Sequence, residues 1–165
     1  MKTKIFGMLS LAFLCATLCA TVSPFALARD SRVDLSTRQA IYVTKSKTSI
    51  DLRNDKYVAP NGTITLNRRQ AQSCEGNKCT FNLGIIAIKS GGPSALNAYG
   101  QYTGQTFGSV GNTIVFGDGE GTKQQVLPVS LAIGKNVVTF TIDPEKKITE
   151  TNEANNSMTV TVVVE

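Results

Sequence analysis

Two pairs of acidic residues are the side chains best placed in this sequence for acid–base chemistry. Asp118 and Glu120 are separated by one residue, and Glu150 and Glu153 by two. Glycosidases hydrolyse their substrates with two such carboxyl groups. Their sites usually hold the sugar on aromatic side chains, however, and this chain has no Trp. A carboxylate-based hydrolase is therefore an alternative function, and we expect no catalytic residue.

The sequence contains no His, the side chain most often used as a general base or metal ligand near neutral pH. Ser-His-Asp catalysis, Cys-His catalysis and His-ligated zinc are therefore excluded. The glycines between Gly104 and Gly121 could suggest a phosphate-binding loop. They are followed by neither a Gly-Lys-Ser/Thr ending nor a helical pattern. We expect no cofactor.

Five side chains with oxygen ligands lie close together near the C-terminus and raise the question of calcium. They are Asp143, Glu150, Glu153, Asn155 and Asn156. Calcium takes six to eight oxygens. The segment lacks the closely alternating Asp/Asn run of a calcium loop, and Lys146-Lys147 adds positive charge beside it. We expect the carboxylates to accept hydrogen bonds from backbone N–H groups instead, with calcium ligation as the alternative.

The first 28 residues have the organisation of a secretory signal peptide. Lys2 and Lys4 form a positive start, an apolar run from Ile5 to Val22 follows, and Ala26-Leu27-Ala28 supplies the small residues of a cleavage site. We expect cleavage after Ala28, export to the periplasm or the medium, and no transmembrane segment in the mature chain. An uncleaved transmembrane anchor is the alternative, because the apolar run could nearly span a bilayer.

The four cysteines divide into two pairs. Cys15 and Cys19 could accept lipid, but Leu rather than a small residue precedes each of them, so we expect both to leave with the signal peptide. Cys74 and Cys79 then remain, with Gly76-Asn77 between them as a turn. In an exported protein this pair predicts a disulfide that closes a tight hairpin. A redox pair is the alternative, although redox motifs space their cysteines by two residues.

The charge of the mature chain does not indicate a nucleic-acid partner. Lys2 and Lys4 leave with the signal peptide, so 15 of the 17 basic residues remain against 12 acidic ones. The basic residues are scattered, apart from Arg68-Arg69 and Lys146-Lys147. Nucleic-acid binding requires a basic stripe beside stacking aromatic residues, which the sequence lacks.

The elements that would position these residues are β-strands. Residues 29–47 form a polar N-terminal segment, either a tail or a leading edge strand, and from residue 48 short alternating apolar runs are separated by Gly, Asn, Asp and Pro. Apolar residues alternate most clearly in 138–142 and 158–164. In 81–88 the alternation shifts phase, which predicts a bulge or a strand covered on both faces.

No window of twelve residues in the mature chain shows helical periodicity, so these runs predict an all-β fold. We expect an immunoglobulin-like antiparallel β-sandwich of about seven to eight strands over residues 48–165. The segment Gly117 to Gly121 is expected to be the tip of a hairpin.

The C-terminal third is similar to a known family. The stretch Gly134 to Pro144, GKNVVTFTIDP, and the stretch Ile148 to Asn156, ITETNEANN, resemble the last two strands and their linker in CARDB domains, the cell-adhesion-related domains found in bacteria. The resemblance extends over residues 131–164 and, more weakly, over 80–92. It implies an immunoglobulin-like sandwich of an extracellular protein.

The linker residues can also be interpreted from their own chemistry. Pro144 favours an extended backbone for Asp143 in a turn. Asn155 and Asn156 tolerate left-handed backbone and can bond their neighbours, which suits re-entry into the final strand.

The signal peptide, the strand pattern and the CARDB-like end predict an exported, non-catalytic binding or cell-surface adhesion module of a bacterium. Its partner would be an envelope protein or a glycan. The alternative is a periplasmic inhibitor or chaperone accessory that acts through an edge strand or a hairpin. The Gly-rich segment from Phe107 to Phe116 would then form the contact.

Overall fold

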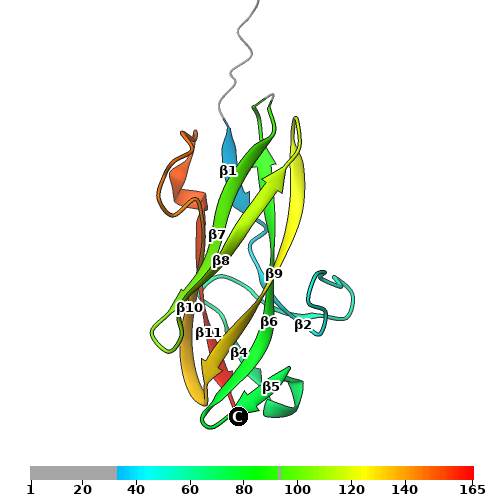
Figure 1. Cartoon of the computed structure of the whole chain (residues 1–165), viewed down its shortest axis with the longest axis vertical. Helices are drawn as coiled ribbons and strands as arrows, with labels where there is room; N and C mark the ends of the chain where they lie inside the picture. The colour runs from blue at the N-terminus through cyan, green and yellow to red at the C-terminus, as the bar shows by residue number, and fades with distance from the viewer. Residues whose placement is uncertain (1–32, 93) are drawn as a thin grey trace, which may run out of the picture.

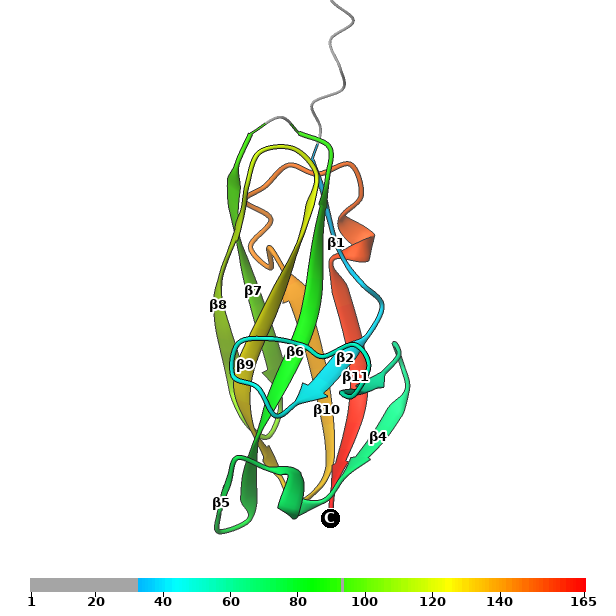
Figure 2. The ribbon, with the colours of Figure 1, turned by 90° about the vertical axis from the view of Figure 1, so that its right-hand side faces the viewer.

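Two β-sheets packed face to face make up the fold (Figures 1 and 2). The computed structural model describes residues 33–92 and 94–165. One sheet has six strands and the other has five, which confirms the predicted all-β sandwich. The predicted signal peptide, its cleavage site, Cys15 and Cys19 lie outside the described residues.

The six-stranded sheet is built on its longest strand, β6 (Lys78–Ser90). β9 (Gly121–Ala132) pairs with nearly the whole length of β6 on one side. Three short strands share the other side of β6, and β3 extends the sheet from β2. These four strands are β1 (Asp34–Thr37), β2 (Ile41–Thr44), β3 (Lys56–Val58) and β5 (Ser73–Glu75).

The five-stranded sheet has the order β4-β11-β10-β7-β8. Its strands are β4 (Thr63–Leu66), β7 (Leu96–Gly104), β8 (Gly108–Phe116), β10 (Gly134–Ile142) and β11 (Ser157–Val164). β4 pairs with β11 in parallel, whereas the other pairs are antiparallel. Two 3-10 turns, η1 (Arg68–Gln70) and η2 (Glu153–Asn155), complete the elements.

The strand count and one pairing differ from the expectation. The described residues form eleven strands rather than seven or eight, and the β4–β11 pair makes the sandwich mixed rather than purely antiparallel. Strands of three or four residues are too short to show alternation in a sequence, and all five short strands lie in the N-terminal half.

The N-terminal segment is part of the sandwich. Leu35 in β1 and Ile41 in β2 are fully buried, and both strands pair with β6. Of the two predictions for residues 29–47, a tail or a leading edge strand, the structure is nearer to the second, because β1 and β2 both pair within the six-stranded sheet.

β6 is covered on both faces, as one of the two interpretations of its phase shift predicted. Phe81, Leu83 and Ile85 point into the core between the sheets. On the opposite face, Ile86 packs with Tyr42 and Ile50 in a second apolar cluster. The loop that carries Ile50 lies over the strand so closely that a Cβ on Gly84 would stand 2.7 Å from the Ile50 Cγ1 atom.

The segment Gly117 to Gly121 is not a hairpin tip, contrary to our expectation. It joins β8 in one sheet to β9 in the other. The hairpin lies earlier, where β7 turns into β8 between Gly104 and Gly108, and Gly108 has a φ of 75°. Glycine is common in both kinds of turn, so composition did not distinguish them.

Among residues 33–92 and 94–165, no helix has the length and apolar character needed to cross a membrane.

Candidate functional site

The outer face of the five-stranded sheet presents similar side chains from all five of its strands. Because side chains alternate across a strand, every second residue of β4, β7, β8, β10 and β11 points away from the core. More than half of these outward residues are Ser or Thr. The hydroxyl-bearing ones are Thr63, Thr65, Thr103, Ser109, Thr113, Thr139, Thr141, Ser157, Thr159 and Thr161. We call this surface the threonine face.

Neighbouring strands hold several of these side chains in fixed positions. The hydroxyls of Thr139 and Thr159 lie 2.8 Å apart across β10 and β11, and those of Thr141 and Ser157 lie 3.1 Å apart. These pairs follow directly from the strand register, which sets each residue opposite its partner. Hydroxyls ordered in this way lose less side-chain entropy when they bind a ligand.

The threonine face carries almost no charge. Lys135 is the one charged residue among its outward positions, at the start of β10. The solvated face of an antiparallel sheet is usually polar, and the chain as a whole is 18% charged, so such a low charge on this face is unusual for this sequence. This face therefore offers a charged group no opposite charge across most of its surface.

Tyr99 adds an aromatic ring to the face. It is 45% exposed, and its ring lies on Gly111 of the neighbouring strand. A Cβ on Gly111 would stand 2.5 Å from the Tyr99 hydroxyl oxygen and 2.6 Å from Cζ, so only glycine leaves room for the ring there. One side of the ring is thus supported by the sheet, while the exposed part can contact a ligand.

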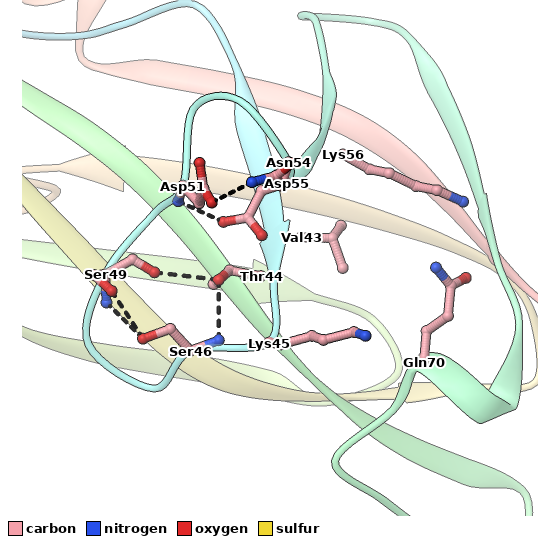
Figure 3. A pocket seen from close by; sticks show the side chains of 10 residues that line it. All are labelled: Val43, Thr44, Lys45, Ser46, Ser49, Asp51, Asn54, Asp55, Lys56 and Gln70. Atoms are coloured by element: carbon pink, nitrogen blue, oxygen red, sulfur yellow. Dashed lines mark hydrogen bonds between the residues drawn. The ribbon is translucent and has the colours of Figure 1, made fainter.

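A separate hollow of about 410 Å³ lies beside the loop that follows β2 (Figure 3). Its polar residues are largely used by the loop itself. Thr44 Oγ1 donates a hydrogen bond to the Ser49 carbonyl oxygen and accepts one from the Ser46 N–H. The Asp51 carboxylate accepts hydrogen bonds from Arg53 N and Asn54 Nδ2. The Asn54 bond is the main reason why the pKa of Asp51 lies below its ordinary value. We assign these groups to shaping the loop.

The predicted oxygen cluster is divided by the structure into separate hydrogen-bonding groups. Asp143 is buried, and its two carboxylate oxygens accept hydrogen bonds from Lys147 N at 3.2 Å and Ile148 N at 2.7 Å. Its φ is 49°, so the expected extended backbone at Asp143 is wrong. The side chain stabilises the left-handed turn by bonding the N–H groups that follow, which outweighs the preference imposed by Pro144.

Glu150 and Asn156 form the second group. Asn156 Nδ2 donates to Glu150 Oε1 at 2.8 Å, and the Leu35 N–H of β1 donates to Glu150 Oε2 at 2.5 Å. Burial raises the pKa of Glu150 above its ordinary value, although both hydrogen bonds oppose that shift. Asn156 has a φ of −81°, so it acts through its side chain rather than through a left-handed backbone.

The third group connects Asn155 to the same N-terminal strand. Asn155 Nδ2 donates to Asp34 Oδ2 at 3.1 Å, and Thr151 Oγ1 donates to Asp34 Oδ1 at 3.4 Å. Glu153 lies in η2.

In the described part of the chain, no three His, Cys, Asp or Glu residues come together as metal ligands. Sequence reasoning missed β1 as the partner of this linker, since the two segments are more than 100 residues apart.

The carboxyl pairs considered for hydrolysis are placed differently from each other. Asp118 lies in the connection between the sheets, where its Oδ1 accepts a hydrogen bond from Ala95 N at 2.8 Å. Glu120 is exposed in the same connection. Glu150 is engaged with β1 as described, and Glu153 contributes only a weaker, like-charge effect on the pKa of Glu150.

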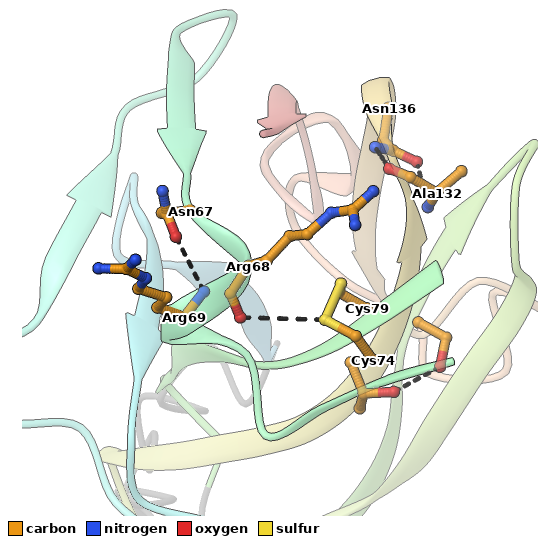
Figure 4. The surroundings of a disulfide bond; sticks show 9 residues. Asn67, Arg68, Arg69, Cys74, Cys79, Ala132 and Asn136 are labelled. Atoms are coloured by element: carbon orange, nitrogen blue, oxygen red, sulfur yellow. Dashed lines mark hydrogen bonds between the residues drawn. A yellow bond between two sulfur atoms is a disulfide. The ribbon is translucent and has the colours of Figure 1, made fainter. Parts of the chain in front are cut away.

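Cys74 and Cys79 form the predicted disulfide and lie directly opposite each other in the β5–β6 hairpin (Figure 4). Gly76 in the turn has a φ of 56°, which glycine adopts without strain. Cys79 is buried in the core, whereas Cys74 is exposed. The Cys74 sulfur lies 3.9 Å from the Arg68 carbonyl oxygen, but a disulfide sulfur has no hydrogen to donate, so this is a packing contact.

Two buried polar side chains that hold loops were missed by sequence reasoning. Lys89 is fully buried, and its Nζ donates to the carbonyl oxygens of Ser94, Gly117 and Gly119 at 2.7, 3.0 and 2.6 Å. Asn136 holds the turn between β9 and β10, because its Oδ1 accepts from the Ala132 N–H and its Nδ2 donates to the Ala132 carbonyl oxygen (Figure 4). Each of these polar residues stands where the alternation of its strand places an inward side chain. A polar residue at such a position indicates a buried hydrogen-bonding role.

Comparison with known proteins gives similarity at the level of fold. No protein-family model and no curated protein matches the chain. Two solved structures of the CARDB domain of PF1109 from Pyrococcus furiosus are each 16% identical and cover 81% of this chain. The first, described as a complex with di-metal ions, has a TM-score of 0.48 over 90% of that chain, and the second, a solution structure, has 0.47 over 96%.

The N-terminal domain of PorA is also similar, with 12% identity, a TM-score of 0.38, and coverage of 80% of this chain and 98% of that one. The first two structures belong to the family that residues 131–164 resemble. The chain is thus an all-β sandwich that is similar to CARDB domain structures.

Proposed function

We propose that the protein is an exported, non-catalytic binding module whose threonine face adheres to a neutral glycan. The observation that carries this proposal is the near absence of charge on a five-stranded face with ordered hydroxyls. Sugars present hydroxyls that both donate and accept hydrogen bonds, as Ser and Thr do. The glycan class deepens the broader expectation of an envelope protein or glycan partner.

The half-exposed ring of Tyr99 supports a sugar rather than another ligand. An aromatic face is apolar and suits the C–H face of a pyranose ring, while the neighbouring hydroxyls suit its edge. The paired hydroxyls of β10 and β11 lie on an open sheet face rather than inside either of the two hollows described for residues 33–92 and 94–165, which supports adhesion over catalysis. Export rests on the predicted signal peptide and on the Cys74–Cys79 disulfide, because disulfides persist in oxidising compartments.

The proposal is tested by retention of the purified exported protein on a neutral insoluble glucan and on its carboxymethylated derivative. We expect retention on the neutral glucan. Tyr99→Ala and, separately, Thr139→Lys should reduce it about tenfold, since each removes roughly one contact of about 1.4 kcal/mol. Thr122→Lys places the same charge on an exposed residue of β9 in the other sheet and should leave retention unchanged.

Folding of every variant is checked by its thermal unfolding. Equal retention of the parent, Tyr99→Ala and Thr139→Lys would contradict the proposal. Capture of an envelope protein that Thr139→Lys abolishes, without glucan retention, would instead assign the threonine face to a protein partner.

A further inference from the structure

A second surface lies on the side of the sandwich where both sheets end. β8 is the last strand of the five-stranded sheet, and β9 pairs only with β6 in the other. The two strands run along the same side of the molecule (Figures 1 and 2). A groove of about 320 Å³ lies between them, lined by residues 112–115 of β8, residues 123–126 of β9, and Lys47-Thr48.

The two free edges differ in how well they are protected against pairing with another strand. β9 carries Lys123 and Pro128, and charged residues and proline are the usual means of blocking an edge. β8 is nine residues long and contains neither a charged residue nor a proline. An edge of that length and composition is open to an added strand.

The register shows which backbone groups of β8 face the groove side. Asp143 N donates to the Tyr99 carbonyl, so the backbone polar groups of Tyr99 face β10 rather than β8. Thr113 lies opposite Tyr99 and therefore belongs to a pair without mutual hydrogen bonds. By alternation, the N–H and C=O groups of Ser109, Gly111, Thr113 and Val115 point outward from the sheet edge.

One outward group of this edge is already satisfied by a nearby side chain, because Asn112 Oδ1 accepts the Thr113 N–H at 2.8 Å. By the same alternation the Asn112 carbonyl faces β7 rather than the edge, and Gln125 of β9 donates to it from Nε2 at 2.9 Å. Gln125 thus holds β8 against β9 from the inside, at one point of the groove. The outward groups of Val115, near the end of β8, have neither of these contacts.

The charge of the groove indicates the kind of strand that would fit. Lys47 and Lys123 line it, and no acidic residue does. The uncharged β8 strand of a second copy would leave both lysines without a partner. An extended segment with acidic side chains would pair with β8 through its backbone and with the lysines through its carboxylates.

We propose that the β8 edge binds an extended, acidic peptide segment of another protein, which adds a sixth strand to the five-stranded sheet. This inference does not rest on the glycan proposal, because it uses the strand edge and the lysines rather than the outer face. The peptide supplies the backbone hydrogen bonds that the edge lacks, and Lys47 and Lys123 select its charge.

The test uses a labelled peptide of the same length as β8 that alternates Thr and Val and carries two Asp residues. Its dissociation constant for the full chain is measured by fluorescence anisotropy. Val115→Pro should weaken binding about tenfold, because proline removes an outward N–H while leaving the bonds to β7 in place. Val115→Thr is the matched control, since it keeps the N–H, and should bind like the parent.

The charge of the groove is tested separately, so the proposal does not depend on the folding of a proline variant. The double change Lys47→Glu and Lys123→Glu should reverse the preference between the Asp peptide and the same peptide with Lys at those positions. Lys78→Glu, in the β5–β6 hairpin, is the control and should leave the preference as it was. Equal binding by the parent, the folded proline variant and the double variant, or no measurable binding of the Asp peptide, would overturn the inference.

Discussion

Individual buried polar residues in this sandwich differ in whether their hydrogen bonds are made. Lys89 satisfies all three of its N–H donors with carbonyl oxygens, whereas the Tyr102 hydroxyl is buried without a partner in the described structure. Burial raises the pKa of Tyr102 well above its ordinary value, so the group is neutral. A paired polar group stabilises the fold, and an unpaired one costs free energy.

Lys89→Met should lower the free energy of unfolding by about 3 kcal/mol, because three carbonyl oxygens from two loops would lose their donor. The side chains have similar length, so lost packing contributes little. Urea denaturation measures the change. Lys135→Met, at an exposed position, is the control and should change stability by less than about 0.5 kcal/mol. A loss as small as that of the control would show that the loops find water or other donors.

Tyr102→Phe should stabilise the protein by up to about 1 kcal/mol, because it removes a buried hydroxyl without a partner. The ring would keep its edge-to-face contact with Phe140, where the centroids are 5.0 Å apart. Thermal unfolding measures the result. Clear destabilisation would mean that the hydroxyl bonds a buried water.

Glu150 should make stability depend on pH in the acid range. Burial is the main reason why the pKa of Glu150 lies above the ordinary 4.5, and the negative charges of Glu153 and Asp143 raise it further. The folded state therefore holds this proton more tightly than the unfolded state, so the free energy of unfolding falls as pH rises from 4.5 through the raised pKa.

Urea titrations at a series of pH values test this expectation. Glu150→Gln removes the titrating group, so its stability relative to the parent should improve as pH rises through that interval. A constant difference between the two proteins would contradict the raised pKa.

At the scale of elements, long alternating strands were predictable and short or crossing segments were not. β10 and β11 have apolar residues at every inward position except Gly134 and Asn136 and were identified from that pattern. β1 and β2 have four residues each, too few for alternation to stand out. The Gly117–Gly121 connection was predicted to be a hairpin, because a glycine-rich composition is the same whether the next strand lies in the same sheet or in the other one.

The β5–β6 hairpin should depend on its disulfide for stability only. Changing Cys74 and Cys79 together to Ser should cost about 2 kcal/mol on the chain-entropy model, which lowers the melting temperature by about 6 °C in a domain of this size. Calorimetry of the parent and the double variant measures it. If glucan retention or peptide binding were lost in the folded variant, the hairpin would be part of a binding site.

The linker between β10 and β11 should be independent of calcium. The carboxylate oxygens of Asp143 and Glu150 already accept hydrogen bonds from N–H groups, so calcium or a chelator should leave the melting temperature unchanged. Glu150→Ala should cost roughly 1 to 3 kcal/mol through the unpaired Leu35 N–H. A rise in melting temperature with calcium that Glu150→Gln abolishes would establish the alternative, ion ligation.

At the scale of the whole molecule, both proposed surfaces depend on strand order, which the sequence does not state. The threonine face combines outward residues from five strands that span residues 63 to 163. In the sequence of each single strand, polar residues such as Thr alternate with apolar ones, which is common in β-strands and does not reveal a shared surface. The groove likewise requires that β8 and β9 end their sheets on the same side. The sequence identified residues 107–116 as a possible contact only through their glycine content, whereas the position of β8 at the end of its sheet needed the strand order.

The positions of the first and last strands have a mechanical consequence. β1 begins near one end of the long axis, and the C-terminus lies at the other (Figure 1). β11 is held between β10 and the parallel strand β4, and the terminal Glu165 N–H bonds the Leu66 carbonyl. Tension applied through the two ends would pull both strands along their own axes. Their hydrogen bonds would then bear the force together in shear rather than open one after another.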